Sequence, residues 1–220
     1  MSLPTLLFDL DGTLINSEPG ITRGAAHAFT QLGEPAPEPE VLRSWIGPPL
    51  RDSFATRIGD PARVEQALAL YRERYEAVGW TEHEVYPGIA DAVLALHRAG
   101  ARLAVVTAKI EAHARRIVEH LPFGHCFGNV IGATPDGRLS YKPELIAEAL
   151  SRLGATAQEC VMIGDRRMDM DGARHHGMRG IGVLWGFGSA QELRKAGAAR
   201  VLSQPSELRE LLDVSARRAS

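Results

Sequence analysis

Residues 6–14 read Leu6-Leu7-Phe8-Asp9-Leu10-Asp11-Gly12-Thr13-Leu14, and this stretch decides the fold. Its short apolar run is typical of a buried strand in the middle of a parallel sheet. Gly12 then allows the sharp turn with which the chain leaves the strand. Asp9 and Asp11 are two positions apart, so their carboxylates lean to the same side. Because two close anions repel and are costly to desolvate, the pattern indicates a cation or a shared proton at this point.

The second half of the chain alternates between strand and helix patterns. Such alternation is typical of a parallel sheet with helices on both faces. The sequence therefore predicts the α/β class, with a Rossmann-like doubly wound parallel sheet as its core. After the first strand, the predicted strands cover residues 102–107, 130–133, 160–163, 180–184 and 200–202.

Residues 15–84 contain no good strand candidate, and apolar residues recur there at helical spacing. We expect helices near residues 25–32 and 41–45. Asp60-Pro61 opens a third, long helix, because aspartate is a favoured N-cap and proline fits the first helical position. The sequence predicts two domains: an α/β core of residues 1–14 and 87–220, and an inserted helical domain of residues 15–86.

The overall composition excludes several classes of function. The formal net charge is -2, so no basic field favours nucleic acid or an anionic membrane. No apolar run approaches the roughly 20 residues that span a bilayer, and the first residues lack the features of a signal peptide. The two cysteines, Cys126 and Cys160, are too few for a disulfide framework and indicate reduced thiols. We expect a cytoplasmic protein, a monomer or a homodimer, that binds neither nucleic acid nor membrane.

Polar residues gather where the predicted strands end, which is where open α/β sheets bind ligands. Taken singly, each has an ordinary alternative: Asp165 as a helix cap, Thr107 as a packing residue, Lys142 as a surface lysine. Two acids at the end of one buried strand are harder to explain structurally. Convergence on a single rim is more specific than any one motif. The residues predicted to share this rim are Asp9, Asp11, Thr107, Lys142, Asp165 and Asp169.

These residue types suit a phosphate pocket with a metal ion. Hard carboxylate oxygens, without cysteine or histidine nearby, favour Mg²⁺ over zinc. Lys142 adds a positive charge for phosphate, and the Thr107 hydroxyl and main-chain N–H groups can hold its other oxygens. An ionised Asp9 is then a credible nucleophile that would form an aspartyl phosphate. Asp11 can give a proton to the leaving alkoxide and later take one from water.

The same residues resemble the motifs of the haloacid dehalogenase superfamily. Asp9-Leu10-Asp11-Gly12-Thr13 resembles its first motif, DxDGT, and Thr107 and Lys142 match the second and third. Gly164-Asp165 with Asp169 resembles the fourth motif, in its GDxxxD form. The motifs occur in the family's order, and the resemblance covers essentially the whole chain. It implies a phosphatase whose helical insert, residues 15–86, is a cap domain.

On the metal side, the resemblance implies that Asp9 is both the nucleophile and a Mg²⁺ ligand. Asp11 would be the acid/base, with its main-chain carbonyl on the metal. Asp165 would be the third protein ligand. Asp169 would orient a metal-bound water or the lysine of the third motif. An acid at position 11 also argues against a dehalogenase, because dehalogenases of the superfamily lack one there.

On the phosphate side, the resemblance implies that Thr107 and the N–H of Ala108 hold the phosphate oxygens. Lys142 would neutralise the phosphate charge. The cap would decide the substrate, and its candidate residues are Gly47, Arg43 and Arg51. Solvated arginines on a helix are an equally ordinary reading of these two side chains.

Within the superfamily, residues 46–50 and 181–189 resemble phosphoglycolate phosphatase-like and nucleotidase-like phosphatases. We therefore expect a small phosphorylated metabolite as substrate, most similar to phosphoglycolate. A 5′-nucleotidase, a sugar-phosphate phosphatase and a phosphohexomutase are alternative enzymes. A phospho-aspartate receiver domain is the alternative outside enzymes, although receivers are shorter and have no helical insert after the first strand.

Overall fold

The computed structural model describes residues 3–215, and the side chains of residues 3–212. Its centre is a six-stranded sheet of order β5-β4-β1-β6-β7-β8 in which every pairing is parallel. The order starts in the middle, runs to one edge and then continues from the middle to the other edge. The predicted doubly wound α/β sheet is thus confirmed. The strands are β1 (Thr5–Phe8), β4 (Leu103–Ile110), β5 (Phe127–Ala133), β6 (Cys160–Gly164), β7 (Arg179–Val183) and β8 (Arg200–Leu202).

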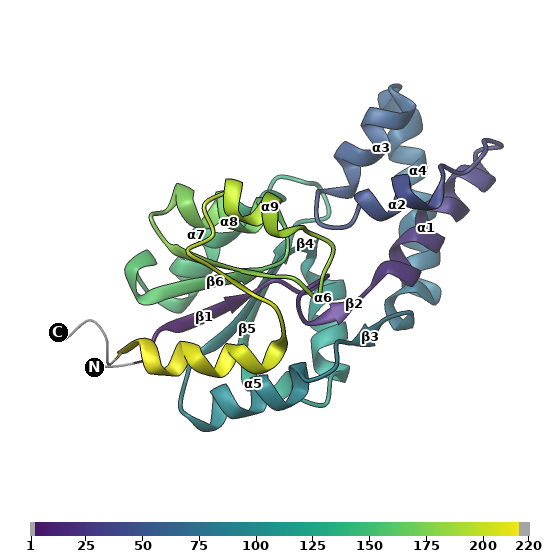
Figure 1. The fold of residues 1–220 in the computed structure, drawn as a ribbon. Helices are drawn as coiled ribbons and strands as arrows, with labels where there is room; N and C mark the ends of the chain where they lie inside the picture. The colour runs from purple at the N-terminus through teal and green to yellow at the C-terminus, as the bar shows by residue number, and fades with distance from the viewer. Residues whose placement is uncertain (1–2, 216–220) are drawn as a thin grey trace.

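Helices cover both faces of the sheet (Figure 1). The alternation of side chains along β1 sends Leu6 and Phe8 to one face and Leu7 to the other. On the face of Leu6 lie α5 (Ile89–Arg98), α6 (Glu111–His120) and η4 (Pro205–Ser215). On the face of Leu7 lie α7 (Lys142–Leu153) and α8 (Arg167–His175). The shorter elements are α9 (Ala190–Lys195), η2 (Gly124–Cys126) and η3 (Ala157–Glu159).

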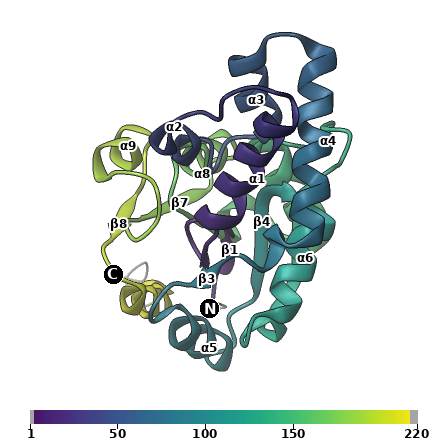
Figure 2. The same cartoon turned by 90° about the vertical axis from the view of Figure 1, so that its right-hand side faces the viewer.

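The four helices between β1 and α5 lie together beyond the carboxyl end of β1 (Figures 1 and 2). They are α1 (Glu18–Gln31), α2 (Pro39–Ser44), α3 (Leu50–Ile58) and α4 (Pro61–Ala77), followed by the turn η1 (Gly79–Thr81). Asp60 caps α4 as expected, because its side chain accepts a hydrogen bond from the main-chain N–H of Arg63 at 2.9 Å. The sequence interpretation did not include α3.

A short ribbon joins the two places where the chain passes between the sheet and these helices. It consists of β2 (Ile15–Asn16) and β3 (Glu84–Val85), which pair antiparallel. The expectation of no strand in residues 15–84 is therefore wrong at the two ends of that segment. The reason is that each of these strands has two residues, which is too short to give a detectable alternation of apolar and polar side chains.

Aromatic rings form the core of the helical segment. Neighbouring rings of Phe29, Trp45, Phe54, Tyr71 and Tyr75 have centroids 5.1 to 6.4 Å apart. The five side chains are buried and come from α1, α3, α4 and the residue that follows α2. Large rings with few rotatable bonds fix the arrangement of short helices at low entropic cost. Tyr75, at the end of this series, lies next to the sheet.

Two further expectations bear on the environment of the protein. Cys126 and Cys160 are both buried and free, so neither takes part in a disulfide. Within residues 3–215, no helix combines the length and the apolar character needed to cross a bilayer. The prediction that there is no signal peptide rests partly on Met1 and Ser2, which lie outside the described residues.

Candidate active site

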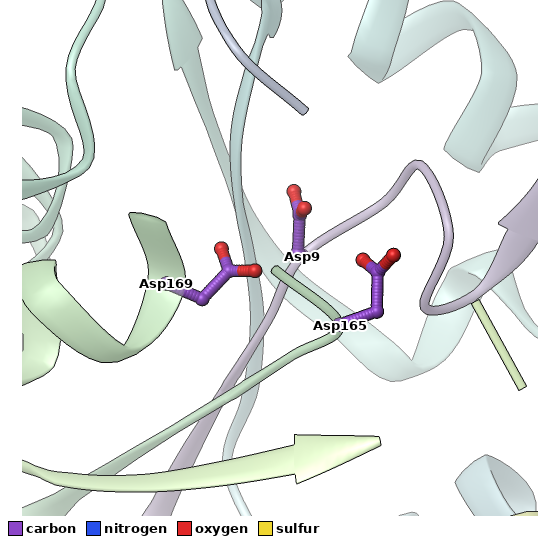
Figure 3. Close-up of side chains that lie close together, drawn as sticks. All are labelled: Asp9, Asp165 and Asp169. Atoms are coloured by element: carbon purple, nitrogen blue, oxygen red, sulfur yellow. The ribbon is translucent and has the colours of Figure 1, made fainter. Parts of the chain in front are cut away.

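Three buried carboxylates meet at the carboxyl end of the central strands (Figure 3). Asp9 follows β1, Asp165 follows β6, and Asp169 lies in the first turn of α8. Because β1 and β6 are neighbours, their ends place residues far apart in sequence side by side. One carboxylate oxygen of each residue lies within 4.8 Å of the others. The three residues are between 0% and 3% exposed, so water screens their charges little.

Lys142, the first residue of α7, binds two of these acids. Its Nζ lies 2.8 Å from Oδ1 of Asp9 and 2.7 Å from Oδ1 of Asp169, and it also donates to the carbonyl of Val106 at 2.8 Å. Burial alone would lower the pKa of the lysine. Asp169 and Asp9 outweigh that effect and raise it. The ammonium therefore stays charged beside the carboxylates.

The cluster still carries excess negative charge. Burial raises the pKa of Asp9 to about 7, although Lys142 opposes the increase. Burial, with the nearby Asp169 and Asp9, also raises the pKa of Asp165 well above its usual value. One lysine thus cannot compensate three buried acids. Hard oxygen donors with uncompensated charge are what a divalent cation such as Mg²⁺ binds, so the residues present fit that ion.

Asp165 is held rigidly between two loops. Its Oδ2 accepts the N–H of Phe187 at 2.8 Å, and its Oδ1 accepts the hydroxyl of Thr13 at 3.3 Å. Gly12 has a φ of +81°, and a β-carbon there would lie 2.2 Å from Oδ2 of Asp165. A β-carbon at Gly188 would lie 1.8 Å from the carbonyl of Asp165. The loop after β1 therefore requires glycine to approach this carboxylate, and the loop after β7 requires glycine to approach the main chain of the same residue.

Asp11 has a lysine of its own, which the sequence interpretation did not identify. Nζ of Lys109 lies 3.1 Å from Oδ1 of Asp11. The same ammonium donates to the hydroxyl of Tyr75 at 2.8 Å and lies 4.7 Å from the centre of that ring. The side chain of Lys109 is 6% exposed, and β4 continues to Ile110, three residues beyond the predicted end of the strand. Its place directly after Thr107 and Ala108 was the available signal.

A cavity of about 110 Å³ lies between this edge of the sheet and the helical segment. Thr107 is 1% exposed, and its hydroxyl accepts the N–H of Lys109 at 3.3 Å. The cavity lies between the helices and the two aspartates of residues 6–14, both of which border it. Its walls include Asp9, Thr107 and Ala108 from the core, and Gly47, Arg51 and Arg72 from the helical segment.

The candidate residues of the helical segment lie in different places. Gly47 and Arg51 border the cavity, and Arg51 forms an ion pair with Glu65. Arg43, by contrast, is not among the residues that line it. Its guanidinium lies 3.3 Å from Glu18 and 5.5 Å from the centre of the Phe187 ring.

Arg72 is a cavity residue that the sequence interpretation missed. It donates to the carbonyl of Pro135 at 3.0 Å, and no carboxylate within residues 3–212 forms an ion pair with it. Burial lowers the pKa of Arg72, and the nearby charge of Arg51 lowers it further. Its spacing from Leu68 and Tyr75, four and three residues away, places it on the apolar face of α4, and this was the available signal.

Comparison with known protein families agrees with this geometry. The model of the haloacid dehalogenase-like hydrolase family matches residues 6–183 of the chain. This chain is a haloacid dehalogenase-like hydrolase. The matched segment runs from β1 to the end of β7, so it includes all the acids and lysines of the site. The family resemblance seen in the sequence is confirmed.

Several named proteins resemble the chain along almost its whole length. A 5′-nucleotidase of Pseudomonas aeruginosa is 40% identical over 211 residues, which are 96% of this chain and 96% of that protein. The tyrosine-protein kinase PtkA of Mycobacterium tuberculosis is 38% identical over 212 residues, 95% of this chain and 72% of that protein. A crystal structure described as a predicted phosphatase from Clostridium acetobutylicum has a TM-score of 0.90 and 34% identity, and it covers 96% of this chain and 100% of that one.

The buried acids of this hydrolase predict that its stability without metal falls as the pH rises. The pKa of Asp9 is raised from 3.8 to about 7 on folding, so the folded state binds more protons between these values. The free energy of unfolding then decreases with rising pH, by about 1.4 kcal/mol per pH unit for one such group. Divalent cations prefer ionised carboxylates to protonated ones, so we expect Mg²⁺ to raise Tm more at pH 8 than at pH 5. Thermal unfolding in EDTA and in Mg²⁺ measures this, and an equal shift at both pH values would contradict it.

Proposed function

We propose that this chain is a magnesium-dependent phosphomonoester hydrolase that acts through an aspartyl phosphate on Asp9. The observation that carries the proposal is the position of Asp9: it follows the central strand, contacts Lys142 at 2.8 Å and belongs to a cluster of acids that fits a divalent cation. Asp11 lies two residues away with a separate ion-pair partner. A nucleophile and a proton donor are thus available side by side.

The metal would be held by the carboxylates of Asp9 and Asp165 and by the main-chain carbonyl of Asp11. When bound, Mg²⁺ supplies positive charge that draws the phosphate in and offsets its repulsion by the nucleophile. Asp169, at 2.7 Å from Lys142, orients that lysine toward the phosphate or holds a metal-bound water. The hydroxyl of Thr107 and the N–H of Ala108 hold the remaining phosphate oxygens.

Two displacements at phosphorus complete the reaction. An Oδ atom of Asp9 forms a bond to phosphorus while the bond from phosphorus to the ester oxygen breaks, and Asp11 gives its proton to the departing oxygen. A water molecule then attacks the phosphorus of the aspartyl phosphate and passes a proton to Asp11. The carboxylate of Asp9 and inorganic phosphate are released, and one acid has served both steps.

We also propose that residues 15–86 act as a cap that closes over the site, with hinges near residues 15–17 and 86–88. Several contacts between the helices and the core support this role. Tyr75 accepts from Lys109, Arg72 donates to the carbonyl of Pro135, and Tyr141 donates to Asp52 at 3.1 Å. A closed cap excludes water from the phosphoenzyme and brings its own side chains to the leaving group.

The cavity favours a small substrate that carries a second anionic group, as phosphoglycolate does. Its volume of about 110 Å³ suits a small leaving group. Arg72 borders it beside Arg51, and a guanidinium without a carboxylate partner in a half-buried position favours binding of a carboxylate or a second phosphate. A 5′-nucleotidase is the second candidate, because a relative with that name is 40% identical to this chain.

A panel of phosphomonoesters tests both the reaction and the substrate class. We expect phosphate release with Mg²⁺ and none in EDTA, and a higher kcat/KM for 2-phosphoglycolate than for nucleoside monophosphates. Arg72→Met should lower kcat/KM for 2-phosphoglycolate by about 10-fold, the contribution of one charge-assisted hydrogen bond. It should leave 4-nitrophenyl phosphate within about 2-fold, because this substrate has no second anion.

Arg57 on α3 is exposed, so Arg57→Met is the matched control and should leave both substrates unchanged. An equal loss on both substrates in Arg72→Met would contradict the anion-binding role. A preference for nucleoside monophosphates in the parent chain would favour the nucleotidase instead. Isomerisation of a sugar 1-phosphate in place of phosphate release would identify a phosphohexomutase.

A further inference from the structure

We propose that Lys109 and Tyr75 are positioning residues that orient Asp11 for proton transfer, so that the helical segment completes the acid/base only when it is docked. This inference rests on the proposed function. It assigns a role to a second buried lysine that the four sequence motifs do not include. It also gives one hydroxyl of the helical segment a part in a reaction whose other groups lie on the core.

The contacts form a continuous series from α4 to the loop after β1. The hydroxyl of Tyr75 accepts from Nζ of Lys109 at 2.8 Å, and that Nζ lies 3.1 Å from Oδ1 of Asp11. The ammonium also lies 4.7 Å from the centre of the Tyr75 ring, within the range of a cation–π contact. The side chains of Lys109 and Asp11 are only 6% and 10% exposed. Shielded from water, these contacts fix geometry more strongly than surface pairs do.

The two lysines of the site have separate partners. Lys142 contacts Asp9, Asp169 and the carbonyl of Val106. Lys109 contacts Asp11 and Tyr75. Each aspartate of the first motif therefore has its own cation. Lys142 is placed to neutralise the nucleophile and the phosphate. The ammonium of Lys109 lies beside Asp11 instead, so its position requires a different explanation.

The contact with Lys109 is an ion pair with one oxygen of Asp11, and its charge attraction favours the orientation in which that oxygen faces the ammonium. Oδ1 of Asp11 faces the ammonium, and within residues 3–212 Oδ2 of Asp11 forms no ion pair. Oδ2 is then the oxygen free to exchange a proton with the ester oxygen and later with water. The ammonium of Lys109 contacts both Asp11 and the hydroxyl of Tyr75. Movement of α4 away from the sheet removes the contact with Tyr75, so the ammonium is held less firmly beside Asp11.

A purely structural reading is that the contact only docks the helices on the sheet. The two readings differ in how they depend on the leaving group. Loss of docking lowers activity on all substrates alike. Misorientation of the acid matters most for a basic leaving group, which needs a proton as its bond to phosphorus breaks. Phenyl phosphate and 4-nitrophenyl phosphate are similar in shape, but phenolate is much the more basic leaving group.

The test compares kcat/KM for these two substrates in Tyr75→Phe, which removes the hydroxyl and keeps the ring. We expect a loss of about 10-fold on phenyl phosphate, part of the 10²–10⁴-fold that general acid catalysis contributes. On 4-nitrophenyl phosphate we expect a change of less than about 2-fold. Because kcat/KM reports only the steps up to phosphoenzyme formation, a slow second step does not obscure the ratio. Lys109→Met, with its folding checked by circular dichroism, should change the ratio in the same direction.

Tyr71→Phe is the matched control. Tyr71 stacks on Tyr75 with ring centroids 5.5 Å apart and is also buried, and within residues 3–212 its hydroxyl forms no hydrogen bond. We expect it to keep the substrate ratio of the parent chain. An unchanged ratio in Tyr75→Phe, or the same change in Tyr71→Phe, would overturn this inference and leave the proposed function intact. A parent chain that hydrolyses neither substrate in Mg²⁺ would overturn both.

Discussion

Replacing Asp9 with asparagine is expected to lower kcat for aryl phosphate hydrolysis by at least about 10⁴-fold. Losses of this size are typical when the nucleophile of an enzyme is replaced. The amide has nearly the same shape as the carboxylate but cannot form the acyl phosphate. It also relieves the repulsion among three buried acids, so we expect Tm in EDTA to rise or stay unchanged. Steady-state hydrolysis of 4-nitrophenyl phosphate and thermal unfolding measure the two effects.

Asp171→Asn is the control for this substitution. Asp171 lies on α8 two residues after Asp169, but it pairs with Arg167 and Arg174 at the surface and stands outside the cluster. We expect it to keep near-normal activity. Undiminished turnover in Asp9→Asn would refute the assignment of the nucleophile. A low Tm in that variant would show instead that the loss reflects folding.

Replacing Lys142 with methionine is expected to affect both stability and activity. The side chain is 3% exposed and contacts two carboxylates, so its removal leaves buried charges without compensation. Breaking such a pair costs about 3–5 kcal/mol of the free energy of unfolding. The loss should be greatest at pH 8 without metal and smaller at pH 5, where Asp9, with a pKa of about 7, is protonated. Activity should fall by about 10²–10³-fold through loss of electrostatic stabilisation.

Urea unfolding in EDTA at the two pH values measures the first effect, and hydrolysis with saturating Mg²⁺ the second. Lys195→Met removes an exposed lysine on α9 and serves as the control, with no expected change in either quantity. A loss of stability in Lys142→Met that does not depend on pH would contradict the view that the lysine acts by compensating ionised acids.

Much of the core and its site could be predicted because these residues obey local rules. The apolar run of residues 6–8 and the strand–helix alternation after residue 86 depend on periodicity, which the sequence states directly. In a parallel sheet the carboxyl ends of neighbouring strands meet. Residues that end separate strands, such as Asp9 and Asp165, could therefore be brought together by topology alone.

Other features could not be predicted, because they depend on contacts between the sheet and the helical segment. The strand β4 continues beyond Thr107 through Lys109, and the ammonium of this lysine donates to the hydroxyl of Tyr75 on α4. Arg72 looks like an ordinary charged residue of a helix until the loop at Pro135 is seen to lie against it. Helix α3 has few strongly apolar positions, with Phe54 its only buried residue, so its periodicity is weak.

The ribbon of β2 and β3 has a consequence for engineering. Ile15 pairs with Val85 and Asn16 with Glu84, so the chain enters and leaves the helical segment at adjacent points. A segment whose ends are adjacent can be exchanged without moving the elements that carry it. We expect residues 17–83 to be replaceable by the corresponding segment of a related hydrolase, joined through the same two residue pairs of the ribbon. A library of such chimaeras would vary the choice of leaving group on a constant set of reacting side chains.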